Sequence, residues 1–549
     1  MSHERRLWGA FGLLALAVVL AWANSLLVPF VYDDRLEVVG NRTIQDLSQW
    51  QLILGYNLSR PITIGSYALN HAVHGEQVLG FHLVNVVLQV LNAGLALIAG
   101  RALAKLGGHA RPLWVGGLAA ALWALHPLAT ESVTYIAGRS ELLAGGFVLL
   151  GLWAWSRWLA QGERALAALA WACAALGVLC KESAVVLPAL MLATEWLLAR
   201  EGQGKQVKWL SYWPGVAGLA LFFGARIWVY GSMTSLAEPL RPLSVQIPTQ
   251  GVAWWLYAKL TLLPIGQSLF HGLPERGWDG VAIGAALSWL ALGIAALTQV
   301  KRRPVLLFVL LWWALCLAPS SSVVALKETF AEHRSYLALL GPALALAWAV
   351  SSWEKPVGRW ASLGLCVVLM GATHLRNRVW SSEVSLWQDA VDKNPVSAEA
   401  WYALGDARRL AKDPQGARKA YKSAIRVNPQ YAQAWNNLGL LEVELGGWDA
   451  AEDAWKQALI QDTSYCPAHN NLGKLYGEQG RYQLAAVELN TTLSKCPRDC
   501  TAHRLLGELY QDRLRDKRLA VMHYEAYLEI CPSESWSPEI RERLTRLTW

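Results

Sequence analysis

The chain has 549 residues, of which 54% are hydrophobic and only 16% are charged. This composition is too apolar for an ordinary soluble enzyme and is typical of a protein that crosses a membrane several times. The net charge of +8 is spread over short connections, which indicates orientation in a membrane and argues against nucleic-acid binding. The sequence contains no zinc-type Cys/His spacing, phosphate-binding Gly loop or Ser nucleophile elbow.

From residue 7 to about residue 374, apolar runs alternate with short polar connections. Each run is a candidate membrane-spanning helix. The predicted spans are 7–29, 81–104, 112–129, 140–159, 165–180, 184–199, 209–230, 279–300, 304–319, 335–352 and 357–373. One further run, 251–270, contains Lys259, Pro264 and Gln267. We expect this run to enter and leave on one side of the membrane or to lie at its surface.

The distribution of Lys and Arg supports that expectation. Basic residues lie in the first segment, MSHERR, and in alternate connections as far as Lys301-Arg302-Arg303. Positive residues favour the cytoplasmic side, and these positions agree with one another only if 251–270 does not cross. The predicted count is then eleven spans with the C-terminal part outside, although Arg376 and Arg378 oppose this orientation.

After residue 380 the sequence becomes repetitive. The segments AWYALG, AWNNLG, AHNNLG and AHRLLG carry glycines spaced 34 residues apart at Gly405, Gly439, Gly473 and Gly507. This is the tetratricopeptide period, in which each repeat forms two helices and stacked repeats enclose a concave groove. The sequence therefore predicts an all-α protein with a polytopic transmembrane domain at 1–378. An α-solenoid of four full repeats after a partial one follows at 379–549.

The predicted topology collects unusual polar residues on the outward side of the membrane. They are Asp33, Asp34, Arg60, His126, Glu131, Arg139, Lys181, Glu182, Arg226, Glu328, Glu332, His333, Arg334 and Tyr336. Individually they have ordinary explanations: a lone Arg anchors a span end, His126 closes a helix end, and Lys181 and Glu182 form a surface pair. Cations gathered on the outward face instead favour an anionic ligand, such as a lipid-linked phosphate, that Arg and Lys bind well.

Five ordered motifs resemble one known family. They are FVYDDRLEVVGN, SRPITIGSYALNHAVHG with GFHLVNVVLQ, LHPLATESVTYIAGRSELLA, LCKES and AEHRSYLALLG. Together with the repeats they resemble the TMTC family (transmembrane and tetratricopeptide-repeat containing) over the whole chain. The resemblance implies a GT-C fold and an inverting O-mannosyltransferase. Such an enzyme transfers mannose or another hexose from a polyprenyl-phosphate donor to Ser or Thr of a protein.

The resemblance also assigns residues. Its catalytic acids correspond to Asp33, Asp34 and Glu131. The residues that we expect to bind the donor phosphate are Arg60, Arg139, Lys181, Arg226, His333 and Arg334. Two departures from the family pattern occur: KES stands where KEQ is commoner, and His333 is inserted before Arg334 in AEHRSYL, which puts the register of that arginine in question.

The chemistry agrees with these assignments. A Ser or Thr hydroxyl must lose its proton as it attacks the anomeric carbon, so a carboxylate within hydrogen-bond reach is required. The leaving phosphate needs nearby cations and no proton donor. Two or three carboxylates could hold a divalent metal, but the reaction does not require one. The expected partners are the lipid-linked sugar, an exported acceptor protein and the bilayer, without nucleic acid.

The expected location is a bacterial inner membrane with the site and repeats in the periplasm, or the lumenal side of the ER membrane in a eukaryote. Recurring amides at Asn436, Asn437, Asn470 and Asn471 are expected to bind the acceptor backbone in the repeat groove. Two other functions stay open. One is a non-catalytic scaffold whose repeats recruit exported proteins, and the other is a transferase acting on a glycolipid or cell-wall polymer.

Four cysteines occupy regular positions in the repeats. Counted from three residues before the recurring Trp or His, Cys466 and Cys500 open a repeat. Cys496 and, after one inserted residue, Cys531 close one. The two helices of a repeat are antiparallel, so these ends lie at one edge, and we expect the disulfides Cys466–Cys496 and Cys500–Cys531. The alternatives are a Cys496–Cys500 bridge or four free thiols in a reducing compartment.

Overall fold

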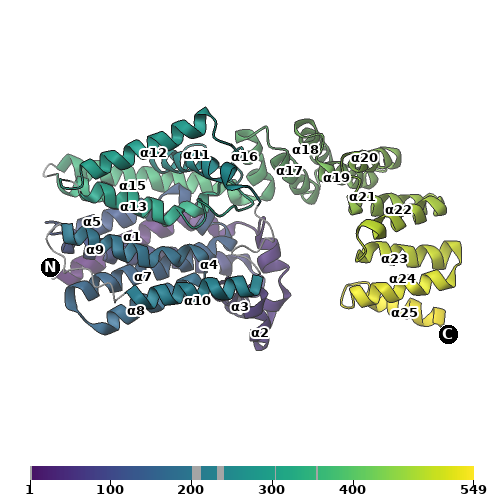
Figure 1. Ribbon diagram of the computed structural model, residues 1–549, viewed down its shortest axis with the longest axis horizontal. Coiled ribbons are helices and arrows are strands. Elements are labelled where there is room, and N and C mark those ends of the chain that lie inside the picture. The colour runs from purple at the N-terminus through teal and green to yellow at the C-terminus, as the bar shows by residue number, and fades with distance from the viewer. Residues whose placement is uncertain (1–2, 201–211, 231–239, 303, 354–355, 549) are drawn as a thin grey trace. The chain divides into compact units, whose positions relative to one another are not determined.

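The computed structural model describes residues 3–200, 212–230, 240–302, 304–353 and 356–548, and every regular element in them is a helix. Contacts divide the chain into two compact units, Met1–Asp389 and Ala390–Trp549. The helices of the first unit are α1 (His3–Trp22), α2 (Trp50–Tyr56), α3 (Pro61–His74), α4 (Val78–Leu106), α5 (Pro112–Ala124), α6 (Thr130–Val133), α7 (Arg139–Gln161), α8 (Arg164–Val178), α9 (Leu187–Arg200), α10 (Trp213–Tyr230), α11 (Leu243–Leu262), α12 (Gly280–Thr298), α13 (Pro304–Leu317), α14 (Leu340–Ser351) and α15 (Pro356–Asn377) (Figure 1).

The second unit is the repeat solenoid, and α16 joins it to the first. Its helices are α16 (Glu383–Lys393), α17 (Ala398–Leu410), α18 (Pro414–Val427), α19 (Ala432–Glu444), α20 (Trp448–Gln461), α21 (Cys466–Glu478), α22 (Tyr482–Lys495), α23 (Cys500–Leu509), α24 (Lys517–Ile530) and α25 (Ser537–Thr548). The first unit ends at 389 and not at the predicted 378. Glu383 pairs with Arg35, and Asp389 pairs with Arg376, which ties residues 379–389 to the membrane unit.

Helix α4 organises the first unit through one polar stripe. His82, Asn85, Gln89 and Asn92 lie three or four residues apart, so they share one face of the helix. All four are buried, and each hydrogen-bonds one or two backbone carbonyls. His82 contacts the carbonyl of Val28, and Asn85 donates to those of Val133 and Tyr135. Gln89 donates to the carbonyl of Ala124, and Asn92 to that of Leu142. Apart from that of Leu142, which lies in the first turn of α7, these carbonyls lie where neighbouring helices break. Backbone groups inside a membrane must find partners within the protein, and this stripe supplies them.

Buried tryptophans hold the segment that precedes α14. Trp123 Nε1 donates to the carbonyl of Tyr336, and Trp312 Nε1 donates to that of Leu337. The hydroxyl of Tyr336 in turn donates to Gln89 and accepts from Asn92. The segment AEHRSYLALLG is thereby fixed against α4, α5 and α13 before it enters α14.

The number of spans can be compared with helix length and hydropathy. Among the described residues, five helical segments are long and apolar enough to cross a membrane, or six if one bent pair counts as a span. They are Glu4–Leu27, Val78–Leu106, Ile136–Gln161, Glu182–Ala199 and Gly280–Thr298, with Pro112–Ala124 and Pro127–Val133 as the bent pair. Arg164–Val178, Pro304–Leu317 and Leu340–Ser351 are apolar but shorter. Every predicted span contains a described helix, and the count of eleven stays a prediction.

The doubtful run 251–270 forms the second half of α11 and an extended return. α11 is not among the helices that meet the criteria for a span. After Leu262 the chain comes back beside it: Arg276 N–H donates to Thr249 Oγ1 at 2.8 Å. Arg241, just before α11, pairs with Glu275 at 3.0 Å. The chain therefore returns to the end of α11 from which it started, as the charge distribution predicted.

This geometry predicts the labelling of two new cysteines. Cysteines placed at Ser244 and Glu275, in a background without other accessible thiols, should react with an impermeant maleimide from the same side of the membrane. The reason is that Arg241 and Glu275 form an ion pair at one end of α11. Labelling from opposite sides would instead mean that the chain crosses the membrane once between residues 244 and 275, which would place the repeats in the cytoplasm.

The repeats show why their glycines recur. A Cβ added to Gly405, Gly439, Gly473 or Gly507 would lie 2.3–2.6 Å from a side chain of the second helix of the same repeat. The side chains that fill these positions are Tyr421, Trp455, Leu489 and Tyr524. The two helices can approach this closely only if the first carries glycine at the crossing point.

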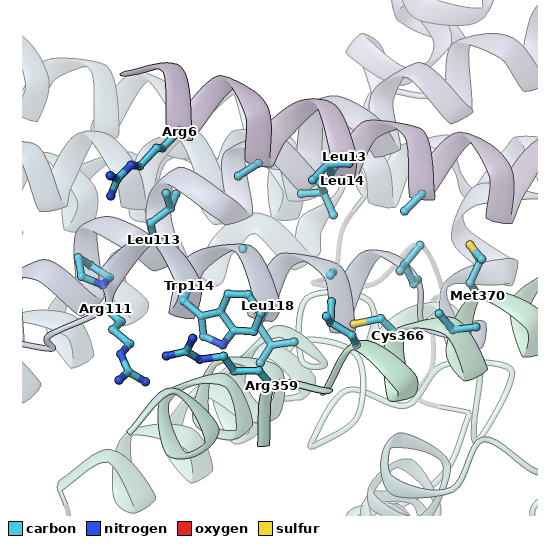
Figure 2. A pocket seen from close by; sticks show the side chains of 18 of the residues that line it. Arg6, Leu13, Leu14, Arg111, Leu113, Trp114, Leu118, Arg359, Cys366 and Met370 are labelled. Atoms are coloured by element: carbon cyan, nitrogen blue, oxygen red, sulfur yellow. The ribbon is translucent and has the colours of Figure 1, made fainter. Parts of the chain in front are cut away.

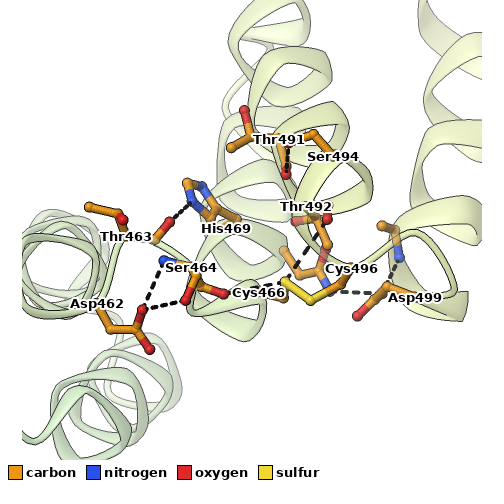
Figure 3. The surroundings of a disulfide bond; sticks show 12 residues. Asp462, Thr463, Ser464, Cys466, His469, Thr491, Thr492, Ser494, Cys496 and Asp499 are labelled. Carbon is orange, nitrogen blue, oxygen red and sulfur yellow. Dashed lines mark hydrogen bonds between the residues drawn. A yellow bond between two sulfur atoms is a disulfide. The ribbon is translucent and has the colours of Figure 1, made fainter.

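The structure contains both predicted disulfides. Cys466 opens α21 and bonds Cys496 just after α22 (Figure 3). Cys500 opens α23 and bonds Cys531 just after α24. The register of the repeats places each pair at one edge, so the predicted pairing is confirmed. Cys173, Cys180, Cys316 and Cys366 are buried and free.

Candidate active site

The two adjacent acids after α1 have different surroundings. The Asp34 side chain is fully buried, and its two oxygens accept the N–H groups of Ala137 at 2.8 Å and Val31 at 3.2 Å. Burial raises the pKa of Asp34 to about 8, against the opposing effect of these two donors. Asp34 therefore fixes the turn that follows α6. Asp33 is only partly buried and its carboxylate makes no backbone hydrogen bond among the described contacts.

Asp33 lies among groups that shift the pKa of its carboxyl group. Its N–H donates to the Tyr135 hydroxyl at 3.1 Å, and Tyr135 also hydrogen-bonds the Asp33 carboxylate. Partial burial raises the pKa of Asp33, while Tyr135 and the positive charges of Lys327 and Arg60 oppose that rise. A carboxylate in this setting can accept a proton from a hydroxyl near neutral pH better than a fully solvated one can.

The residue before Asp33 has an unusual backbone. Tyr32 has φ of 53°, in the left-handed region that residues other than glycine rarely adopt. Its N–H donates to Glu383, and its ring packs edge-on against Trp387. Such a conformation costs about 1–3 kcal/mol and persists only where the surroundings hold it. Here it turns the chain so that Asp34 points into the protein and Asp33 does not.

Glu131 and His333 form a second polar pair. One Glu131 oxygen accepts the backbone N–H of His333 at 2.9 Å, and the other lies 2.7 Å from Nδ1 of the same residue. Burial and the nearby charge of Lys181 lower the pKa of His333 to about 3, so the imidazole is neutral. Its Nδ1 hydrogen-bonds the Glu131 carboxyl, whose own pKa burial raises to about 8. A neutral imidazole brings no positive charge to a phosphate, so the predicted phosphate contact of His333 stays a prediction.

Three of the predicted cations belong to this neighbourhood. Lys181 pairs with Glu141 at 2.8 Å, and Arg60 pairs with Glu182 at 3.2 Å. Arg334 donates from Nη2 to the Glu328 carbonyl. The buried donors without a hydrogen-bond partner in the described part of the chain include two on these cations, Nε of Arg60 and Nη1 of Arg334. An unpaired buried donor costs about 1–3 kcal/mol, and an anionic oxygen would satisfy both.

Other predicted residues have structural roles. Arg139 is fully buried, and its guanidinium donates to Asn85, Asn70, and the carbonyls of Phe81 and Ser66. Its donors are thus used inside the protein, so the predicted phosphate contact does not fit. His126 accepts from Leu128 N–H and contacts the Thr261 carbonyl, which is the helix-end arrangement. The side chain of Arg226, in α10, lies outside the described residues.

The predicted acceptor amides are also engaged. Asn437 donates to Tyr402 and Asp406, and Asn471 donates to Asn436 of the preceding repeat. Asn470 donates to Asp499. Asn436 and Asn470 are buried. The recurring amides therefore join one repeat to the next, and this replaces the predicted role of presenting free amides to a peptide.

Two residues near Asp33, Lys327 and Glu37, were not predicted from the sequence. Lys327 is exposed and its charge reaches Asp33, and Glu37 and Glu328 have raised pKa values because they are largely buried beside it. Glu37 stands inside the motif FVYDDRLEVVGN and Lys327 lies four residues before AEHRSYLALLG, but nothing in their spacing marked them. Glu332 was marked, yet it accepts from Ser268, Gln267 and His271 and so fixes the return after α11.

The charge of Lys327 predicts a pH effect. Replacing Lys327 by Gln removes a positive charge that lowers the pKa of Asp33, so that pKa should rise. If Asp33 must be ionised to act, the acid limb of the rate–pH profile should move to higher pH, with the rate at high pH little changed. The control is Lys301→Gln, which removes an exposed charge from another connection. An unmoved acid limb would contradict the assignment of that limb to Asp33.

Among the described residues there is no cluster of three or more His, Cys, Asp or Glu side chains arranged to hold a metal ion. The fold and this polar site define the chain as a multi-pass membrane protein with a C-terminal tetratricopeptide domain. The tetratricopeptide-repeat family matches residues 384–432, 411–465 and 436–498.

Curated relatives confirm the resemblance to the TMTC family. The chain is 34% identical to the Drosophila melanogaster protein O-mannosyl-transferase Tmtc1, over 49% of this chain and 30% of that protein. It is 25% identical to the Caenorhabditis elegans protein O-mannosyl-transferase F38B6.6, over 74% of this chain and 61% of that protein. Mouse TMTC3, also named a protein O-mannosyl-transferase, is 22% identical over 75% and 50%. The chain thus spans between about a third and three fifths of the length of these relatives.

Solved structures match parts of the chain. MamA is 25% identical, with a TM-score of 0.24, and the match covers 27% of this chain and 80% of that one. Pseudomonas aeruginosa pilF is 21% identical, with a TM-score of 0.28, and the match covers 35% and 83%.

Proposed function

We propose that the protein is an inverting membrane glycosyltransferase that moves mannose or another hexose from a polyprenyl-phosphate donor to Ser or Thr of an exported protein. The observation that carries the proposal is the difference between the surroundings of the two adjacent acids, Asp33 and Asp34. Asp34 is held by two backbone donors, and partly buried Asp33 lies within the fields of Arg60 and Lys327. The names of the relatives support the class of reaction.

In the proposed step, Asp33 accepts the proton of the acceptor hydroxyl as its oxygen attacks the anomeric carbon. The bond from that carbon to the donor phosphate oxygen breaks, and its electron pair stays on the phosphate. Arg60, Lys181 and Arg334 supply the positive charge that stabilises the leaving group. The unpaired donors of Arg60 and Arg334 are the groups best placed to bind its oxygens without breaking an ion pair.

His333 is the second candidate for the base. Its Nδ1 is held by Glu131, and its neutral Nε2 has no hydrogen-bond partner among the described residues. This is the arrangement in which a carboxylate orients an imidazole. We favour Asp33, because partial burial raises its pKa and so makes it a better proton acceptor, and because the resemblance assigns the acid pair to this role.

The expected location is the outward face of a bacterial inner membrane. The disulfides Cys466–Cys496 and Cys500–Cys531 support an oxidising compartment around the repeats. The test is the intact mass of exported proteins from cells with and without this gene. Hexose additions that disappear with the gene, and return with the wild type but not with Asp33→Asn, are expected. Unchanged protein masses, with hexose lost from glycolipid instead, would contradict a protein acceptor.

Deleting the repeats should separate acceptor binding from donor binding. Removal of residues 396–549 leaves α16 and the first unit intact, because that unit ends at 389. We expect transfer to protein to be abolished while the donor lipid still binds, since a tetratricopeptide groove generally holds peptide. Normal modification of a full-length acceptor by the truncated enzyme would show that the repeats do not select it.

A further inference from the structure

A long apolar pocket lies between α1, α5 and α15. Its volume is about 840 Å³, and its walls include Leu14, Leu118 and Cys366 (Figure 2). Leu13 and Val367 on its rim are 73% and 61% exposed, as side chains that face lipid would be. The pocket therefore opens toward the part of the surface that hydrocarbon chains surround.

Three arginines lie together at one end of this pocket. Figure 2 shows Arg6, Arg111 and Arg359 at one end and Met370 toward the other. Within the described part of the chain, no carboxylate pairs with any of the three. Arg111 donates from Nη1 to the carbonyls of Ser351 and Trp353. Three positive charges at the mouth of an otherwise apolar pocket favour an anionic ligand there.

The arginine end is the end far from Asp33. α1, α5 and α15 run in the same direction, because their last residues meet: Asn377 donates to the Ala21 carbonyl, and Trp22 donates to that of Ala124. The arginines stand at the three helix starts. α1 has 20 residues, so its ends are about 30 Å apart, which is the thickness of the hydrocarbon core.

The length of the pocket matches one leaflet. On α1 its lining runs from Arg6 to Ala17, and on α15 from Arg359 to Met370. Eleven residue steps in a helix span about 17 Å. Half of a hydrocarbon core is about 15 Å. An acyl chain whose head group lies at the arginines would thus extend along the whole pocket.

We propose that this pocket binds one anionic glycerophospholipid from the leaflet at the amino-terminal end of α1. Its phosphate contacts Arg6, Arg111 and Arg359, and one acyl chain lies against the apolar walls. Guanidinium groups bind phosphate oxygens with paired hydrogen bonds, so a head group with a net negative charge is preferred over a zwitterionic one. The sugar donor is a different lipid, because its phosphate must lie at the Asp33 end.

Native mass spectrometry of the full chain released from micelles tests the preference. The probes are phosphatidylglycerol and phosphatidylcholine with identical acyl chains. We expect one phosphatidylglycerol to be retained about tenfold more tightly than phosphatidylcholine, which corresponds to about 1.4 kcal/mol. The double variant Arg6→Gln/Arg359→Gln should lose the preference, whereas Arg302→Gln, which removes an exposed charge outside the pocket, should keep it. Equal retention of the two lipids by the wild type would overturn the proposal.

A second variant fills the pocket without changing its charge. A Cβ at Gly117 meets no atom within 4 Å, so Gly117→Phe should occupy the cavity without disturbing the fold. The matched control is Gly284→Phe on α12, where a Cβ also meets open space and the residue does not line the pocket between α1, α5 and α15. We expect Gly117→Phe alone to lose the bound lipid at unchanged melting temperature. If Gly117→Phe still retains the phospholipid, the proposal is wrong. If a polyprenyl phosphate binds more tightly than the phospholipid and depends on the arginines, the proposed occupant is wrong.

Discussion

Asp33→Asn is expected to slow transfer by at least about a hundredfold and to leave the melting temperature unchanged. Asn has nearly the same shape as Asp but cannot accept a proton from the acceptor hydroxyl. The Asp33 carboxylate makes no backbone hydrogen bond, and its Tyr135 partner can still bond an amide oxygen. The measurement is single-turnover transfer by purified enzyme, together with thermal unfolding and donor binding.

Asp34→Asn should behave differently. Both Asp34 oxygens accept backbone N–H groups, and an amide presents only one acceptor to those two donors. One buried donor is left unpaired, so the free energy of unfolding should fall by about 1–3 kcal/mol. Activity should fall with it, because the turn that positions Asp33 loosens.

The control for both variants is Asp46→Asn, an exposed acid on the same loop that caps a short helical turn, a role Asn performs equally well. Full activity in Asp33→Asn would remove Asp33 from the mechanism. Loss of activity in His333→Gln alone, with Asp33→Asn active, would assign the base to the imidazole that Glu131 orients.

Loss of each disulfide is expected to lower the free energy of unfolding of the repeats by about 3–4 kcal/mol in the chain-entropy model. The bridges join residues 30 and 31 positions apart, so each removes considerable freedom from the unfolded chain. The variants are Cys466→Ser/Cys496→Ser and Cys500→Ser/Cys531→Ser. Denaturant unfolding of the full chain, followed by the signal of the repeats, measures the change.

Reductant provides the matched control. It should destabilise the wild type by about the sum of the two losses and should have no effect when all four cysteines are replaced. Peptide mapping without reductant should recover Cys466 with Cys496 and Cys500 with Cys531. Four thiols that alkylate freely would contradict the bridges, and with them the support that they give to an outward location of the repeats.

The repeats show what local pattern can predict. A period of 34 residues fixes which positions meet within a repeat, so the cysteine pairs followed from counting alone. The acid pair did not follow from a local pattern in this way, because Asp33 and Asp34 lie in a turn that enters a short helix, and the positive φ of Tyr32 directs their side chains apart. Which of the two acids is buried depends on the N–H groups of Ala137 and Val31, and the first of these is distant in sequence.

The sequence-based roles of Arg139, Asn437 and Asn471 do not fit the structure for one shared reason. Arg139 looked available for phosphate, but Asn70 and Asn85 reach it from α3 and α4. Asn437 and Asn471 looked like free amides, but their partners stand on the helix one repeat earlier. In each case a polar side chain is satisfied by a residue more than thirty positions away. Spacing in the sequence carries no record of such partners, because the packing of helices brings them together.

The polar stripe on α4 has a consequence for biosynthesis. Asn85, Gln89 and Asn92 enter the membrane before the carbonyls they bind have been made, since those carbonyls lie 48, 35 and 50 residues further along. At 5–20 residues per second, the ribosome needs about 2–10 seconds to supply them. For that interval three amides lie in a span without their final partners, so the nascent chain must hold α4 near water or protein until α5 to α7 arrive.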